Sequence, residues 1–193
     1  MAYAKIIDID DPGYFRLKSI DQSQLKQFLK NPADWAYHRL NDDHKPTDAM
    51  KFGTAFHAYL LGTSDVVSLP EGESFRSKDN QKWRDEQLEA GNIIVSYNDM
   101  QLLKRMKEGI EQTSLMPEYP DYMEIIEQGT KEQCIEWKDR QTGLMLKAKP
   151  DLIPVGTDYL VDLKTAQRPM RNHSPRKSST TVITFRPFST VPR

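Results

Sequence analysis

The chain of 193 residues has only one cysteine and no long apolar run. The single Cys134 excludes an internal disulfide and any metal cluster built from several cysteines, and we expect a reducing cytoplasm as its compartment. No stretch approaches the roughly 20 apolar residues of a membrane-spanning helix, and residues 1–6 lack a secretory signal pattern. With 37% hydrophobic and 28% charged residues, the composition predicts a soluble globular protein that has no membrane partner.

Acidic residues are absent from the C-terminal end. Residues 168–193 contain six Lys and Arg, four Pro and eight Ser and Thr, but no Asp or Glu. The formal net charge of -1 therefore combines an acidic body with a basic tail. Because the tail shows no amphipathic period, we expect one domain over 1–167, followed by a disordered or non-native segment over 168–193. One interpretation is a basic arm for DNA; we prefer a reading-frame shift or truncation that replaced the native end.

Helix signals dominate the first two thirds of the chain, and strand signals follow them. Caps and apolar spacing predict helices over 19–29 with Ser or Asp as the N-cap, from Pro32, over 48–61, over 76–90 and from Ser96, whereas 11–13 and 63–75 are expected to be turn and loop. From Lys131 the apolar period becomes two and predicts a meander of strands 132–138, 144–151 and 159–164. The expected class is α+β, with N-terminal helices packed on a small mixed or antiparallel sheet.

Two acids and a lysine lie near the last of these strands. Asp151 follows a proline, and after ten residues (152–161) an apolar strand ends in Asp162, Leu163 and Lys164. Side chains alternate between strand faces, so Asp162 and Lys164 share a face, and a turn over 154–158 can bring Asp151 to Asp162. Two carboxylates that approach each other repel unless a cation lies between them, and hard oxygen ligands suit Mg²⁺ or Mn²⁺. This pattern is typical of phosphodiester hydrolysis, in which the lysine stabilises the charge of the transition state.

The short motif alone is weak evidence for a metal site. An acid two residues before a lysine also occurs at Asp43 and at Glu136, and composition alone predicts roughly two such pairs. The third pair differs in its apolar strand and in the Pro150–Asp151 pair upstream. Solvated charges at the end of a strand are the alternative interpretation.

A histidine lies in the most apolar predicted helix. His57 follows Gly53 by four residues, so the two share a face, and the glycine permits a close approach. A lone histidine in a buried helix is usually a core residue with satisfied hydrogen bonds. An imidazole can also complete a metal site begun by two carboxylates.

Taken together, these residues resemble the PD-(D/E)xK nucleases and, within them, the exonuclease VIII (RecE-like) exonucleases of phages and prophages. The resemblance covers about residues 14–167. It implies a restriction-endonuclease-like core and a Mg²⁺- or Mn²⁺-dependent exodeoxyribonuclease that acts on linear duplex ends in the cytoplasm, that of the host if a phage encodes it. The matching segments are the serine-led helix with Leu25 and Phe28, Gly53–His57, Arg76–Asp79, Lys147–Asp151 and Asp162–Thr165.

The resemblance also implies roles for individual residues. His57, Asp151 and Asp162 correspond to the metal ligands. The catalytic set is Asp151, Asp162 and Lys164, in which the lysine assists the attack. Glu136, on the preceding strand, is a candidate additional acid, and a surface charge is its alternative interpretation.

Partners follow from the same resemblance. Lys147 and Lys149 are candidate phosphate contacts, which carry no sequence information. The family acts in phage-type recombination beside a protein that anneals single strands, and its members form ring-shaped homo-oligomers.

The chain departs from that family at Arg168. Relatives continue into a helix with a Gln/Tyr motif, whereas this chain continues into the basic tail. If the tail is not native, we expect the strand of Asp162 at a sheet edge, low stability and weak or absent exonuclease activity. The alternative function is a non-catalytic remnant, or a protein that binds nucleic acid or a partner through its basic tail. A RecB-type repair nuclease is a third option, but the iron–sulfur members of that group need more cysteines than Cys134.

Overall fold

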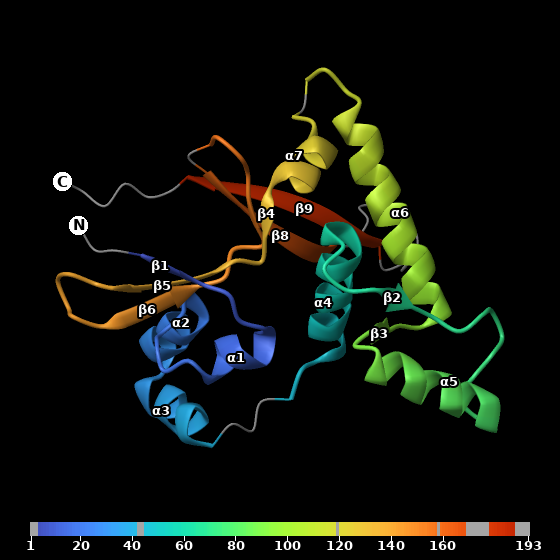
Figure 1. Cartoon of the computed structure of the whole chain (residues 1–193), viewed down its shortest axis with the longest axis horizontal. Helices are drawn as coiled ribbons and strands as arrows, with labels where there is room; N and C mark the ends of the chain where they lie inside the picture. The colour runs from blue at the N-terminus through green and yellow to red at the C-terminus, as the bar shows by residue number, and fades with distance from the viewer. Residues whose placement is uncertain (1–3, 42–44, 119, 158, 169–177, 188–193) are drawn as a thin grey trace.

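The protein is described by a computed structural model that covers residues 4–41, 45–118, 120–157, 159–168 and 178–187 (Figure 1). Helices form most of the first 128 residues and strands most of the rest, which confirms the predicted α+β class. The helices are α1 (Asp11–Arg16), α2 (Gln22–Lys30), α3 (Pro32–Leu40), α4 (Asp48–Leu61), α5 (Lys78–Glu89), α6 (Tyr97–Ser114) and α7 (Tyr122–Gln128). The strands are β1 (Lys5–Ile7), β2 (Val66–Val67), β3 (Ile93–Ile94), β4 (Thr130–Lys131), β5 (Cys134–Lys138), β6 (Met145–Ala148), β7 (Leu152–Ile153), β8 (Tyr159–Arg168) and β9 (Ser178–Pro187).

Side-chain caps begin the helices as the sequence predicts. Asp21 accepts a hydrogen bond from the Gln24 amide at the start of α2, and Ser96 accepts one from the Asp99 amide at the start of α6. The same chemistry begins α1, which was predicted as a turn. There, Asp10 accepts from the Gly13 amide, and a proline in the first turn suits a helix start.

The strands form two antiparallel sheets and one short parallel pair. One sheet has the order β1-β5-β6 and the other β4-β7-β8-β9, while β2 pairs with β3. The expected single meander is therefore wrong, because the strand predicted over 144–151 ends at Ala148. Pro150 has no N–H for a ladder, and the chain passes there from one sheet to the other. The predicted hairpin over 154–158 is confirmed by the pairing of β7 with β8, in which Leu152 lies opposite Val161.

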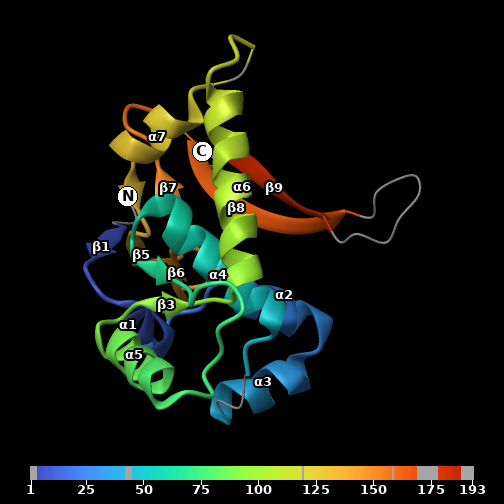
Figure 2. The same cartoon turned by 90° about the vertical axis from the view of Figure 1, so that its right-hand side faces the viewer.

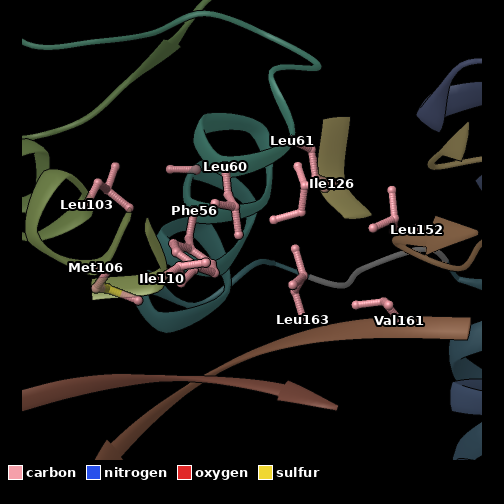
Figure 3. Packing of buried hydrophobic residues seen from close by; sticks show 11 residues of the cluster. Phe56, Leu60, Leu61, Leu103, Met106, Ile110, Ile126, Leu152, Val161 and Leu163 are labelled. Carbon is pink, nitrogen blue, oxygen red and sulfur yellow. The ribbon is translucent and has the colours of Figure 1, made fainter. Parts of the chain in front are cut away.

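The main core lies between the second sheet and the helices α4, α6 and α7 (Figure 3). Phe56, Leu60 and Leu61 of α4 face Val161 and Leu163 of β8. Their burial fixes the face of β8 that points inward. Asp162 and Lys164 consequently lie on the opposite face, as strand alternation predicts. The core also contains Leu103, Met106 and Ile110 of α6, Ile126 of α7, and Leu152 of β7.

Strand β9 covers β8 along its whole length. Ten residue pairs join the two strands, from Tyr159 opposite Pro187 to Arg168 opposite Ser178. The strand of Asp162 is therefore not at a sheet edge, and both strands extend past α6 in Figure 2. Part of the segment expected to be disordered thus forms a strand, whereas 169–177 and 188–193 lie outside the described residues. The division at 167/168 and a non-native end stay predictions.

Among the described residues, no helix is long and apolar enough to cross a membrane.

Candidate functional site

His57 and Asp151 form the centre of the site. His57 lies in the third turn of α4, and Asp151 lies immediately before β7. The His57 Nδ1 is 3.4 Å from Asp151 Oδ1, and the other carboxylate oxygen of Asp151 accepts a hydrogen bond of 2.6 Å from the Leu163 amide. The two side chains are only 23% and 15% exposed. Two residues that are far apart in the sequence thus meet beside the middle of β8, as the metal-site hypothesis requires.

Both nitrogens of the His57 ring face acceptors. Nδ1 faces the Asp151 carboxylate, and Nε2 is 3.1 Å from the carbonyl oxygen of Leu163. An imidazolium can donate to both, whereas a neutral ring can donate to only one. Burial lowers the pKa of His57, but the bond and charge of Asp151 and the Leu163 carbonyl outweigh it, so the pKa is raised above its ordinary 6.5. Burial raises the pKa of Asp151, but His57 and the Leu163 amide outweigh it, so that pKa is lowered.

Asp162 and Lys164 interact with each other on the outer face of β8. The Lys164 ammonium donates a hydrogen bond of 2.9 Å to Asp162 Oδ1. Leu152 lies opposite Val161; Asp151 immediately precedes Leu152, and Asp162 immediately follows Val161. The two acids therefore lie next to a pair of facing residues in neighbouring strands. Each acid also has a cation of this chain beside it: His57 for Asp151, and Lys164 for Asp162.

The donor chemistry fits a hard divalent cation, although the predicted ligands do not converge into one cluster. Two carboxylates and one imidazole suit Mg²⁺ or Mn²⁺. Within the described part of the chain, no three His, Cys, Asp or Glu side chains are grouped so that they could hold a metal ion. His57 and Asp151 are brought together, whereas Asp162 as the third ligand stays a prediction.

Lys147 is not available for the phosphate contact predicted for it. Its ammonium is fully buried and donates hydrogen bonds of 2.9 Å to the Tyr14 carbonyl and 3.3 Å to the Leu17 carbonyl. It also lies 4.4 Å from the centroid of the Tyr14 ring and 3.9 Å from Asp21. Burial lowers the pKa of this lysine. Lys147 therefore attaches α1 to β6, and the prediction of a phosphate contact is wrong for it.

Lys149 lies inside a pocket beside the central pair. Its ammonium forms ion pairs with Asp11 of α1 and, at 3.4 Å, with Glu132. Burial lowers the pKa of Lys149, but the two acids outweigh it and raise that pKa. Together with His57 and Asp151, these three residues line a pocket of about 280 Å³. A phosphate contact by Lys149 stays a prediction.

Glu132 is the acid that sequence reasoning missed. It lies in the pocket with a left-handed backbone, φ 48°, and its amide donates to the Asp151 carbonyl. Such a conformation is uncommon for a residue other than glycine. The period of two had placed Glu132 inside a strand, and no local signal indicated a bend. The predicted additional acid, Glu136, instead lies in β5 of the other sheet, at the ladder position opposite Lys5 and Lys147, and does not line the pocket.

Gly53 does not have the expected role. A side chain at this position would meet only the Thr165 hydroxyl, at 3.8 Å, which is an ordinary contact. Among the residues that the structure describes, no close approach to α4 therefore requires a glycine there.

Comparison with known proteins gives one family. Residues 21–185 match the model of a PDDEXK-like domain of unknown function (DUF3799). No curated protein and no solved structure matches the chain. The matched region includes His57, Asp151, Asp162 and Lys164, and it runs past residue 168 into β9.

Proposed function

The chain belongs to the PDDEXK-like family that matches residues 21–185, and on this premise we propose that it is a Mg²⁺-dependent exodeoxyribonuclease of the exonuclease VIII type. Its substrate would be the end of linear duplex DNA. Homo-oligomers and a single-strand annealing partner belong to the same proposal.

One observation carries the proposal: His57 of α4 lies against Asp151, directly across the ladder from the strand with Asp162 and Lys164. A buried acid whose pKa is lowered by a specific partner, beside a pocket, is typical of a functional site. Both acids, Asp151 and Asp162, lie within the matched residues 21–185.

Each of the four residues would have its own role in phosphodiester hydrolysis. Asp151, Asp162 and His57 would hold the Mg²⁺ ion, which, when bound, polarises a phosphodiester and lowers the pKa of a bound water. Lys164 would stabilise the charge that develops on the phosphate, since its exposed ammonium can reach a substrate. For this, His57 must give up a proton, and Lys164 must turn from Asp162 toward the phosphate.

The test is digestion of a linear duplex by the full chain in Mg²⁺, with a closed circular duplex as the substrate control. Lys164→Ala is expected to reduce the rate at least tenfold, because one transition-state charge contact is lost. The matched variant is Lys138→Ala, which removes the lysine of the second acid-x-lysine pair, in the other sheet, and is expected to leave the rate unchanged. Equal rates for both variants would overturn the assigned roles, and a wild-type protein that leaves the linear duplex intact would overturn the nuclease.

A non-catalytic remnant is the second candidate. It is favoured by the internal pairing of both acids, His57 with Asp151 and Lys164 with Asp162, which leaves each acid neutralised by this chain. Calorimetric titration with Mg²⁺ separates the two candidates. Binding by the wild type that is lost in a folded Asp162→Ala variant favours the nuclease, whereas the same titration curve for both proteins favours the remnant.

A further inference from the structure

We propose that Phe15 stacks on an unpaired nucleobase at the end of a DNA strand, so that helix α1 forms the base-binding wall of the pocket. The inference rests on the proposed function, and it adds that the pocket takes a single unstacked nucleotide. Neither the family match nor the acid and lysine motif assigns a role to this residue, since Phe15 precedes residue 21.

Phe15 is a large aromatic side chain that is 71% exposed and yet lines the pocket of His57 and Asp151. Its neighbour Tyr14 is buried, and the two rings meet edge to face at 5.5 Å and 78°. The ring of Phe15 thus contacts a buried neighbour and is largely exposed at the pocket. An exposed aromatic ring beside a site proposed to bind phosphate is the arrangement by which proteins stack unpaired bases.

Helix α1 has only six residues, and two buried or half-buried lysines hold it in place. The Lys147 ammonium binds the carbonyls of Tyr14 and Leu17, on either side of Phe15. Lys149 pairs with Asp11 at the first residue of the helix. A short helix with three such attachments is a rigid support, so the position of Phe15 relative to Asp151 is fixed before any substrate binds.

The chemistry of the pocket matches the parts of a nucleotide. The Lys149 ammonium, which lies between Asp11 and Glu132, is the cation of the pocket that suits a phosphate. Three further lining residues carry hydroxyl groups, which suit a sugar: Thr54, Thr63 and Ser64. A volume of about 280 Å³ lies near the lower limit of small-ligand pockets and is too small for a base pair with its two sugars.

The experiment is a double-mutant cycle between Phe15 and the terminal base. Affinity of the full chain is measured in Ca²⁺ for a short duplex with ordinary ends and for duplexes with an abasic terminal nucleotide on either strand. The wild type is expected to bind the ordinary duplex about tenfold more tightly than one of the abasic duplexes, which is the usual strength of one base stack. Phe15→Leu, which keeps an apolar side chain, is expected to lose this preference, and Phe15→Trp to keep it.

The matched control is Tyr37→Leu, which removes an exposed aromatic ring from α3, outside the pocket, and should retain the preference. Wild-type affinity that does not depend on the terminal base, or a preference that survives Phe15→Leu, would overturn the stack. Loss of the preference in Tyr37→Leu would do the same. Digestion in Mg²⁺ is a separate readout: a wild-type protein that cleaves DNA without this base preference refutes the stack alone. One that shows the preference but does not cleave refutes the nuclease alone, and one that binds no DNA refutes both.

Discussion

The two sides of the candidate site are held in place by different kinds of interaction. On one side, α4 and β8 fix His57 and Leu163 through a core of fully buried side chains such as Phe56 (Figure 3). On the other side, α1 contributes only Tyr14 to the buried apolar residues, and α2 and α3 contribute none. There, a buried ammonium, Lys147, connects the helix to the sheet.

This difference predicts different responses to mutation. Apolar burial is spread over many contacts and supports the whole domain, so its loss affects global stability. A few polar contacts of Lys147 and Lys149 support one short helix, so loss of the buried Lys147 ammonium should free that helix first. The α4 side and the α1 side of the pocket can therefore be separated by experiment.

The largest expected effect comes from the apolar side. Phe56→Ala removes a fully buried ring between α4 and the sheet and is expected to lower the free energy of unfolding by about 4 kcal/mol. The measurement is urea denaturation followed by circular dichroism. Leu29→Ala, at a residue that is 83% exposed on α2, is the control, with an expected change within about 0.5 kcal/mol. A small loss for Phe56→Ala would mean that α4 is not the centre of the core.

A smaller and more local effect is expected from Lys147→Met, which keeps the length of the side chain and removes its charge. The Tyr14 and Leu17 carbonyls lose their donor, and we expect a loss of about 2 kcal/mol in unfolding free energy. Amide hydrogen exchange should accelerate in α1 while α4 remains protected. The matched Lys138→Met variant, at an exposed lysine of β5, should change neither. Unaltered exchange in α1 would show that Lys147 does not hold the helix.

Local signals in the sequence predicted what depends on local chemistry. The bounds of α4 follow from a Thr47 cap and from Gly62, which takes the left-handed conformation that ends the helix. The alternation of side chains along β8 predicted that Asp162 and Lys164 share one face. The turn predicted over 154–158 pairs the strands on its two sides, so that Asp151 and Asp162 lie near each other. The meeting of His57 with Asp151 required the family resemblance, because a helix and a strand that are 94 positions apart share no local signal.

The errors of the sequence analysis have one common cause. The positions of Lys147 and Glu132 depend on which elements pack together, and an apolar period of two or 3.6 residues does not show this packing. A lysine on a strand is usually solvated, and only the approach of α1 buries Lys147. Likewise, the C-terminal segment has no apolar period of its own, and β9 forms by antiparallel pairing with β8.

The smallest expected effect is the pH dependence of the central pair. In EDTA, the His57–Asp151 pair should stabilise the fold by about 1 kcal/mol between pH 3.8 and 6.5, the ordinary values for the two groups. Because the pKa of His57 is raised in the folded state, this stabilisation is lost as the pH rises above 6.5 through that pKa. Because the pKa of Asp151 is lowered in the folded state, the stabilisation is also lost as the pH falls below 3.8 through that pKa. Urea denaturation of the wild type and Asp151→Asn across this range is the measurement, and the difference between them should be smaller at pH 9 than at pH 5.5. A difference that grows toward alkaline pH would show that His57 is neutral in the folded protein and that the pair is not an ion pair.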